Sequence, residues 1–250
     1  MEVGGPLLFL HGFPGSPDHW EPLLRALAVT KDVHCPRMPW LSNGTPAKRS
    51  QINPTEIVSQ IVKFCFSLSE KPHLVGHDLG AGLVWIIASY FPDAIKTAVA
   101  ISAPHPNAYQ EYLDELETDG YRAYLESLLS GPLDANLEMS PQANAEINEA
   151  AKNKVHLALS ETDPVHIRTY YRTSLAREQI EKLPRLPQIV VPTLQIRGSQ
   201  DSYFPDNLMQ RSAEFGTSPE YVIGDAKHFL PLTHPLQLSQ KLKEFWNQNG

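Results

Sequence analysis

The stretch that most constrains the fold covers residues 74–82, with the sequence Leu-Val-Gly-His-Asp-Leu-Gly-Ala-Gly. An apolar run stops there at the carboxylate of Asp78, among small residues, and then continues as an apolar helical pattern. This arrangement predicts a strand that turns sharply into a helix and exposes the residue at the bend above a sheet. Gly76 and Gly80 flank the bend, where a tight turn against a neighbouring strand leaves no room for a Cβ.

Asp78 determines the chemistry that we expect at this bend. A carboxylate attacks carbon without first losing a proton, and it forms a covalent ester that activated water must then break. Such a nucleophile suits displacement at a saturated carbon, as in opening an epoxide or expelling a halide, better than acyl transfer. The alternative is a structural aspartate that caps the following helix.

Composition limits the class of protein. A chain of 250 residues with 42% hydrophobic residues fits one globular domain, or one domain that carries an insertion. The formal net charge of -7 argues against nucleic-acid binding, since phosphate contacts require the opposite sign. Cys35 and Cys65 form no ligand motif, so we expect neither a disulfide framework nor a metal site. Because no signal-like start or membrane-length apolar run occurs, we expect a cytoplasmic protein that does not bind membranes.

Apolar runs and helical patterns alternate along the chain. The runs predict strands at residues 6–10, 33–38, 73–77, 97–101, 190–197 and 221–223. Amphipathic patterns predict helices between them, and Thr55 is the expected N-cap of one that follows it. This order predicts an α/β fold with a mostly parallel sheet covered by helices on both faces.

The strand pattern stops after residue 104. Pro104 and Pro106 end the run at 97–101, and the following residues are mostly helix-like. A helical block inserted between two strands of a parallel sheet lies above their carboxyl ends, where ligands bind. We therefore expect residues 1–104 and 188–250 to form a core and residues 105–187 a cap. Most tyrosines of the cap should serve packing, while one could donate a hydrogen bond to an oxygen that develops charge.

Three further segments point toward Asp78. The run at 6–10 ends in His-Gly-Phe-Pro-Gly, a tight loop in which the N–H of Phe13 could join that of Leu79 as an oxyanion hole. Asp201 and His228 each follow a predicted strand in the last third of the chain. His228 would activate water, and Asp201 would hold its tautomer. The competing carboxylates and histidines favour other roles: a turn for Asp225, a helix cap for Asp206 and loop filling for His234.

Together these residues resemble the α/β-hydrolase superfamily over nearly the whole chain, and within it the branch with an aspartate nucleophile, the epoxide hydrolases and dehalogenases. Residues 11–14 look like the oxyanion loop of that family and residues 76–80 like its nucleophile motif. The family normally has two strands before the oxyanion loop, for which there is no room here. The resemblance therefore implies a shortened sheet of about six strands with the 33–38 strand at an edge.

The resemblance also distinguishes the dehalogenases from the epoxide hydrolases. Haloalkane dehalogenases usually place a tryptophan directly after the nucleophile, and fluoroacetate dehalogenases place arginines just after it, whereas this chain has Leu79. Epoxide hydrolases use tyrosines of the cap, and Tyr170-Tyr171-Arg172 resembles the segment that carries one of them. The resemblance thus implies Tyr171 as proton donor and Tyr124 as its partner. Epoxide hydrolases often have tryptophan in place of Leu79 too, which implies a reshaped pocket.

The expected function is cofactor-independent opening of an epoxide to a diol, on a small hydrophobic substrate. We group His11, Pro14, His77 and Tyr170 with the residues that contact this substrate. A dehalogenase with the same nucleophile is the enzymatic alternative, and a ligand-binding protein without catalysis is the other. The sequence leaves open whether the chain forms a homodimer.

Overall fold

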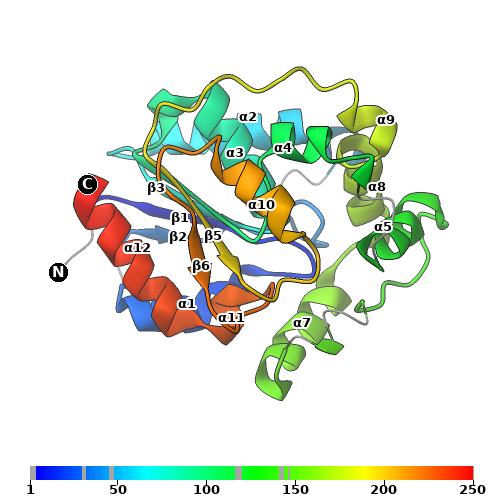
Figure 1. The fold of residues 1–250 in the computed structure, drawn as a ribbon. Helices are drawn as coiled ribbons and strands as arrows, with labels where there is room; N and C mark the ends of the chain where they lie inside the picture. Colours follow the sequence, from blue (N-terminus) through cyan, green and yellow to red (C-terminus); the bar gives the residue numbers. More distant parts are fainter. Residues whose placement is uncertain are drawn as a thin grey trace.

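A six-stranded, all-parallel sheet in the order β2-β1-β3-β4-β5-β6 forms the centre of the computed structural model (Figure 1). The structure describes residues 4–29, 32–44, 48–115, 120–140, 144–145 and 147–249. The strands are β1 Leu7–Leu10, β2 Val33–His34, β3 His73–His77, β4 Thr97–Ile101, β5 Thr193–Gly198 and β6 Tyr221–Ile223. Chain order reverses at β1, which lies between β2 and β3, and parallel sheets bind ligands at such a switch point.

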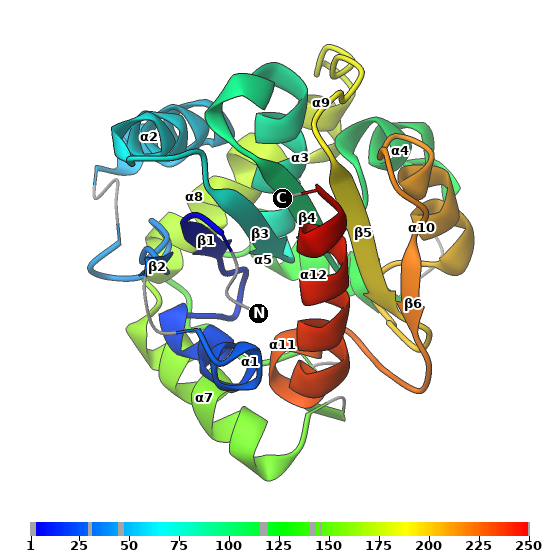
Figure 2. The same ribbon diagram turned by 90° about the vertical axis from the view of Figure 1, so that its left-hand side faces the viewer.

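Both faces of the sheet are buried because successive side chains of a strand point to opposite sides. Leu7 and Phe9 belong to one core cluster and Leu8 and Leu10 to the other. The first cluster contains α1 and α12, and the second contains α2, α3 and α10, so the helices enclose the sheet as two outer layers (Figure 2). The helices of these layers are α1 Glu21–Leu27, α2 Pro54–Ser67, α3 Leu79–Tyr90, α10 Asp206–Ala213 and α12 Pro235–Asn249. Short turns of helix join them: η1 Pro17–Trp20, η2 Arg49–Gln51, η3 Pro92–Ala94 and α11 Leu230–Thr233.

The chain between β4 and β5, which we call the insertion, consists of helices joined by loops and has no strand among its described residues. It contains α4 Pro106–Glu111, α5 Gly120–Ser130, α7 Glu149–Glu161, α8 Pro164–Ser174 and α9 Arg177–Ile180. Helix α4 packs against α10, while α5, α7 and α8 gather at one end of the sheet (Figure 1). A bridge between Leu41 and Thr162 and a hydrogen bond from Asp163 N to Trp40 O attach the corner between α7 and α8 to the segment after β2.

The α/β fold, the parallel six-stranded sheet and the edge position of the second strand are as the sequence predicts. Three boundaries are wrong. Strand β5 begins at Thr193 instead of residue 190, since Pro192 has no N–H to donate within a sheet. Strand β2 is limited to Val33–His34 instead of 33–38, since at the edge it pairs only with the start of β1. Helix α2 is capped by Asn53 instead of Thr55, because Pro54 occupies the first helical position, which suits proline, and Asn53 Oδ1 accepts from Glu56 N at 3.0 Å.

Candidate active site

Asp78 occupies the sharp bend between β3 and α3. Its φ of 55° and ψ of -121° are unusual for a residue with a Cβ, and its N–H donates to Ile101 O at 3.0 Å. The side chain makes no hydrogen bond that caps α3, which argues against the purely structural alternative. A Cβ on Gly80 would lie 2.6 Å from the carbonyl carbon of Leu10 and one on Gly76 2.7 Å from Ala81 N, so only glycine permits this close packing.

The loop after β1 holds one oxygen of this carboxylate. Phe13 N donates to Asp78 Oδ1 at 2.9 Å. A Cβ on Gly12 would lie 2.8 Å from Asp78 Cγ and closer still to Asp78 Oδ1, so the loop and the carboxylate are in direct contact. Leu79, the first residue of α3, has its N–H among the free donors at a helix N-terminus. The structure thus brings the expected oxyanion loop to the expected nucleophile.

His228 and Asp201 complete a chain of three side chains. His228 Nδ1 lies 3.0 Å from Asp201 Oδ2, and His228 Nε2 lies 3.4 Å from Asp78 Oδ2. Asp201 Oδ1 accepts from the N–H of Tyr203 at 2.9 Å, which fixes the carboxylate. The side chains of His228 and Asp201 are each 2% exposed, whereas that of Asp78 is 14% exposed. Asp78 is therefore the most exposed of these three side chains and the one that an incoming molecule can reach.

The pKa values of His228 and Asp78 reflect the position of one imidazole between two carboxylates. Burial alone would lower the pKa of His228, but Asp201 and Asp78 raise it to about 10. Burial likewise opposes ionisation of Asp78, yet the hydrogen bond and charge of His228 hold the pKa of Asp78 below its usual value. The interaction is mutual: His228 favours the carboxylate form of Asp78, and the two carboxylates favour the charged form of His228.

Two residues under the site hold the backbone of His228. Its carbonyl oxygen accepts from His77 Nε2 at 2.9 Å and from Ser102 Oγ at 2.9 Å. His77 is buried, and this burial lowers its pKa to about 4, so it stays neutral and acts on the backbone of His228. The sequence analysis did not identify Ser102, although its place directly after β4 is the signal that found Asp78 and Asp201.

His11 and Pro14 lie in the oxyanion loop and are buried. His11 Nε2 accepts from Met38 N at 3.1 Å, so Nδ1 carries the proton that it donates to Gly12 O at 2.9 Å. Burial lowers the pKa of His11 to about 4. His11 therefore ties the loop to the segment after β2.

Three tyrosines of the insertion lie near Asp78 or the loop that holds it. Tyr171 is buried, and its ring meets that of Phe13 edge-on with the centroids 6.2 Å apart. Tyr170 is buried against Trp40, and burial together with the negative charge of Asp78 raises its pKa. Burial, Tyr203 and Asp78 also raise the pKa of Tyr124. The phenols of Tyr170 and Tyr124 therefore keep their protons at neutral pH.

Two arginines of α8 join the helices that carry these tyrosines. Arg168 donates to Ser127 O at 2.7 Å, and Arg172 donates to Leu129 O at 2.7 Å and to Gly131 O. They satisfy carbonyls at the C-terminal end of α5, where a helix has unpaired acceptors and attracts cations. Tyr124 is thereby fixed relative to α8.

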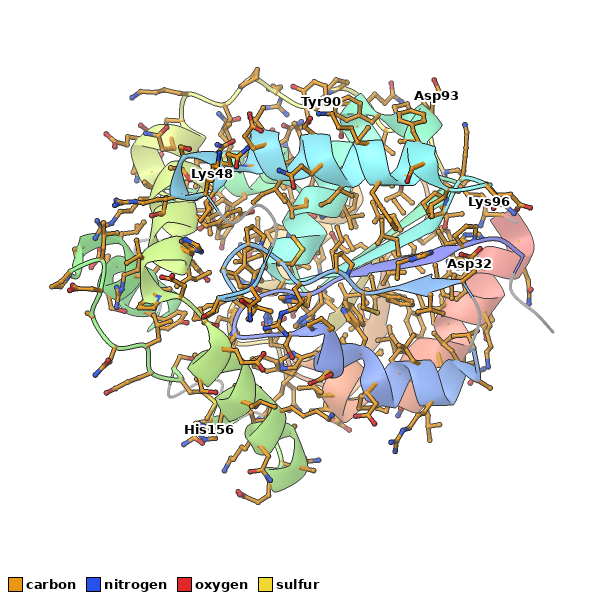
Figure 3. All side chains as sticks on the ribbon, turned by 180° about the vertical axis from the view of Figure 1, so that it is seen from behind. Asp32, Lys48, Tyr90, Asp93, Lys96 and His156 are labelled. Atoms are coloured by element: carbon orange, nitrogen blue, oxygen red, sulfur yellow. The ribbon has the colours of Figure 1, made fainter. Side chains whose placement is uncertain are left out.

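The competing side chains lie elsewhere. Asp225 lies in the turn after β6, as expected, and His234 contacts Thr233. Another histidine, His156, is exposed on α7, at the opposite end of the view from Asp93 (Figure 3). Asp206 is the first residue of α10 and pairs with Arg197 instead of capping the helix, because Pro205 occupies the cap position. The described residues contain no group of three or more His, Cys, Asp or Glu side chains able to hold a metal ion.

The α/β hydrolase fold family matches residues 5–235, which is most of the chain. The chain belongs to this family. Epoxide hydrolase 4 of Homo sapiens is 31% identical over 115 residues, which cover 45% of this chain and 32% of that protein. Epoxide hydrolase 3 of Mus musculus is 26% identical over 265 residues, which cover 96% of this chain and 70% of that protein. The chain thus covers only about a third of the human relative.

A solved structure supports the same fold. A single-residue variant of an epoxide hydrolase from Bacillus megaterium, in complex with its diol product, matches this α/β hydrolase with a TM-score of 0.80. It is 19% identical, and the match covers 98% of this chain and 94% of that one. Within the part of the chain that the structure describes, no helix has the length and apolar character to cross a membrane.

Proposed function

We propose that this α/β hydrolase opens a small hydrophobic epoxide to a vicinal diol through an ester on Asp78. The observation that carries the proposal is the carboxylate at the strand-to-helix bend, with one oxygen on Phe13 N and the other facing His228. Likeness to epoxide hydrolases of human and mouse supports the choice of substrate. Residues 105–187 would act as the cap and residues 1–104 and 188–250 as the core.

In the first step, Asp78 Oδ2 attacks a ring carbon and the bond from that carbon to the ring oxygen breaks. The electron pair passes to the oxygen, which takes a proton from Tyr171 with Tyr124 as second donor. Oδ1, which accepts from Phe13 N, becomes the carbonyl oxygen of the ester.

In the second step, water attacks Cγ of the ester and gives its proton to His228. Charge develops on Oδ1, where the N–H groups of Phe13 and Leu79 stabilise it. Ester formation removes the negative charge of Asp78, one of the groups that raise the pKa of His228, so the imidazole becomes able to release its proton and act as base. This proton, passed through solvent, restores the phenol of Tyr171. When the intermediate formed by attack of water collapses, the bond from Cγ to the substrate oxygen breaks and that oxygen takes the proton from His228, so the diol leaves. The acid proton that remains on Asp78 passes to His228 and the carboxylate is restored.

Product analysis tests the reaction class. We expect purified protein to convert styrene oxide to phenylethanediol and to release little bromide from a bromoalkane, since the residue after the nucleophile is Leu79. Bromide without diol would assign the site to dehalogenation. Neither product from any epoxide or halide would favour a ligand-binding protein.

Intact-mass analysis tests the covalent step. His228→Gln should stop at the ester, so its mass should rise by one substrate after mixing with styrene oxide. The double variant that also carries Asp78→Asn is the control and should not gain mass. An unmodified mass for His228→Gln would contradict ester formation.

A further inference from the structure

A tyrosine outside the expected set lies against the catalytic imidazole. The ring centroid of Tyr203 is 4.5 Å from that of His228, with an angle of 42° between the planes. The N–H of the same residue donates to Asp201 at 2.9 Å. One residue thus contacts both the imidazole and the carboxylate that orients it.

The hydroxyl of Tyr203 extends to the insertion. It shares a hydrogen bond of 2.6 Å with Ser140 Oγ, and both residues are buried, with 7% and 4% of their surfaces exposed. Ser140 belongs to the chain between α5 and α7, whereas Tyr203 follows β5. The bond therefore connects the insertion to the loop that holds Asp201.

We propose that Tyr203 is a positioning residue for His228 in ester hydrolysis, and that Ser140 holds its ring in place. This inference rests on the proposed function. An aromatic face within about 6 Å of a cation stabilises it, and the imidazole becomes a cation when it takes the proton of water. Ring opening uses Asp78 and the tyrosines of the insertion, so it does not need this support.

Substitutions can separate the role of the Tyr203 ring from that of its hydroxyl. Tyr203→Leu removes ring and hydroxyl, Tyr203→Phe removes only the hydroxyl, and Ser140→Ala removes the same hydrogen bond from the other side. Tyr112→Phe is the matched control, because Tyr112 also uses its hydroxyl to connect the insertion to the chain after β5, through Asn207 at 2.9 Å.

Single-turnover kinetics with styrene oxide test the inference, with ester formation and ester hydrolysis followed separately by intact mass. We expect Tyr203→Leu to slow hydrolysis by about tenfold or more while formation changes less than about twofold. Tyr203→Phe and Ser140→Ala should slow hydrolysis equally and by less. Their double variant should be no slower than either single variant, because both remove one bond. Tyr112→Phe should match the unmodified protein.

Titration of the His228 ring by NMR gives a readout that needs no substrate. The charged or titratable groups beside this imidazole are the carboxylates of Asp78 and Asp201, neutral His77 and Tyr203. The rings of Phe204 and Phe229 also lie beside it, at 6.2 and 5.2 Å between centroids, and stay unchanged in the variants. Loss of the aromatic face disfavours the imidazolium, so Tyr203→Leu should lower the pKa of His228 and Tyr203→Phe should not.

The outcomes separate this inference from the proposed function. If His228→Gln forms no adduct, the proposed function fails, and the titration alone decides the role of Tyr203. Equal slowing of both steps in Tyr203→Leu, an unchanged His228 pKa, or additive effects of Tyr203→Phe and Ser140→Ala would overturn the inference. Should Tyr203→Leu fail to fold, the two conservative variants still decide it.

Discussion

The carboxyl edge of the sheet and the insertion fix their side chains by different means. At the edge, Asp78 follows β3 directly and Asp201 comes three residues after β5, and the parallel strands β3, β4 and β5 carry both to the same edge of the sheet. In the insertion, Tyr124 and Tyr171 come from separate helices that arginine side chains hold together. Backbone geometry determines the first region and side-chain packing the second, so substitutions in the two should differ in effect.

Two neighbouring imidazoles at the sheet edge have very different pKa values, because each depends on the groups directly around it. The ring centroids of His77 and His228 are 5.0 Å apart, and both side chains are buried. Burial lowers the pKa of His77 to about 4, whereas two carboxylates raise that of His228 to about 10. His77 is the last residue of β3, whereas His228 lies in the loop after β6, and this loop brings its ring to the carboxylates of Asp78 and Asp201.

The largest effect should come from Asp78→Asn, which keeps the shape of the side chain and removes the nucleophile. Turnover of the epoxide should fall by at least about 10⁴-fold. Loss of the negative charge disfavours the imidazolium, so the pKa of His228 should also fall below 10 in an NMR titration. Residual turnover within about tenfold of the unmodified protein would remove Asp78 from the mechanism.

Gly12→Ala should have the next largest effect, because its Cβ would displace the carboxylate of Asp78 and the N–H of Phe13 together. Ester formation should slow by about 10²-fold or more, as expected when a reacting group is misplaced. Gly82→Ala is the control, since nothing lies within 4 Å of the added Cβ. It should keep full activity and, as a substitution inside α3, raise the melting temperature. Full activity in Gly12→Ala would contradict the contact between loop and nucleophile.

The contrast between the regions also explains what the sequence could predict. The bend at Asp78 and the strand ends before Asp201 and His228 follow from short patterns, because the backbone dictates them. Ser102 follows β4 directly and could have been singled out by that position, but no short pattern shows that its hydroxyl meets the carbonyl of His228. The contact of Tyr203 with His228 depends on how the loop after Asp201 folds, which no short pattern shows either. Likewise, the order of Tyr170 and Tyr171 along α8 does not reveal which hydroxyl meets a substrate.

The smallest effect should come from that pair of tyrosines, which tests the insertion directly. Tyr171→Phe should slow ester formation by roughly 10²-fold, the cost of removing one donor to a developing oxyanion, and should leave ester hydrolysis unchanged. Tyr170→Phe is the matched control on the same helix and should slow formation by less than about threefold, because its ring packs against Trp40. Intact mass, measured over time, follows ester formation and ester hydrolysis separately and so shows which tyrosine donates the proton. The assignment reverses if Tyr170→Phe is the slower variant, and the insertion then supplies its proton from Tyr170 instead.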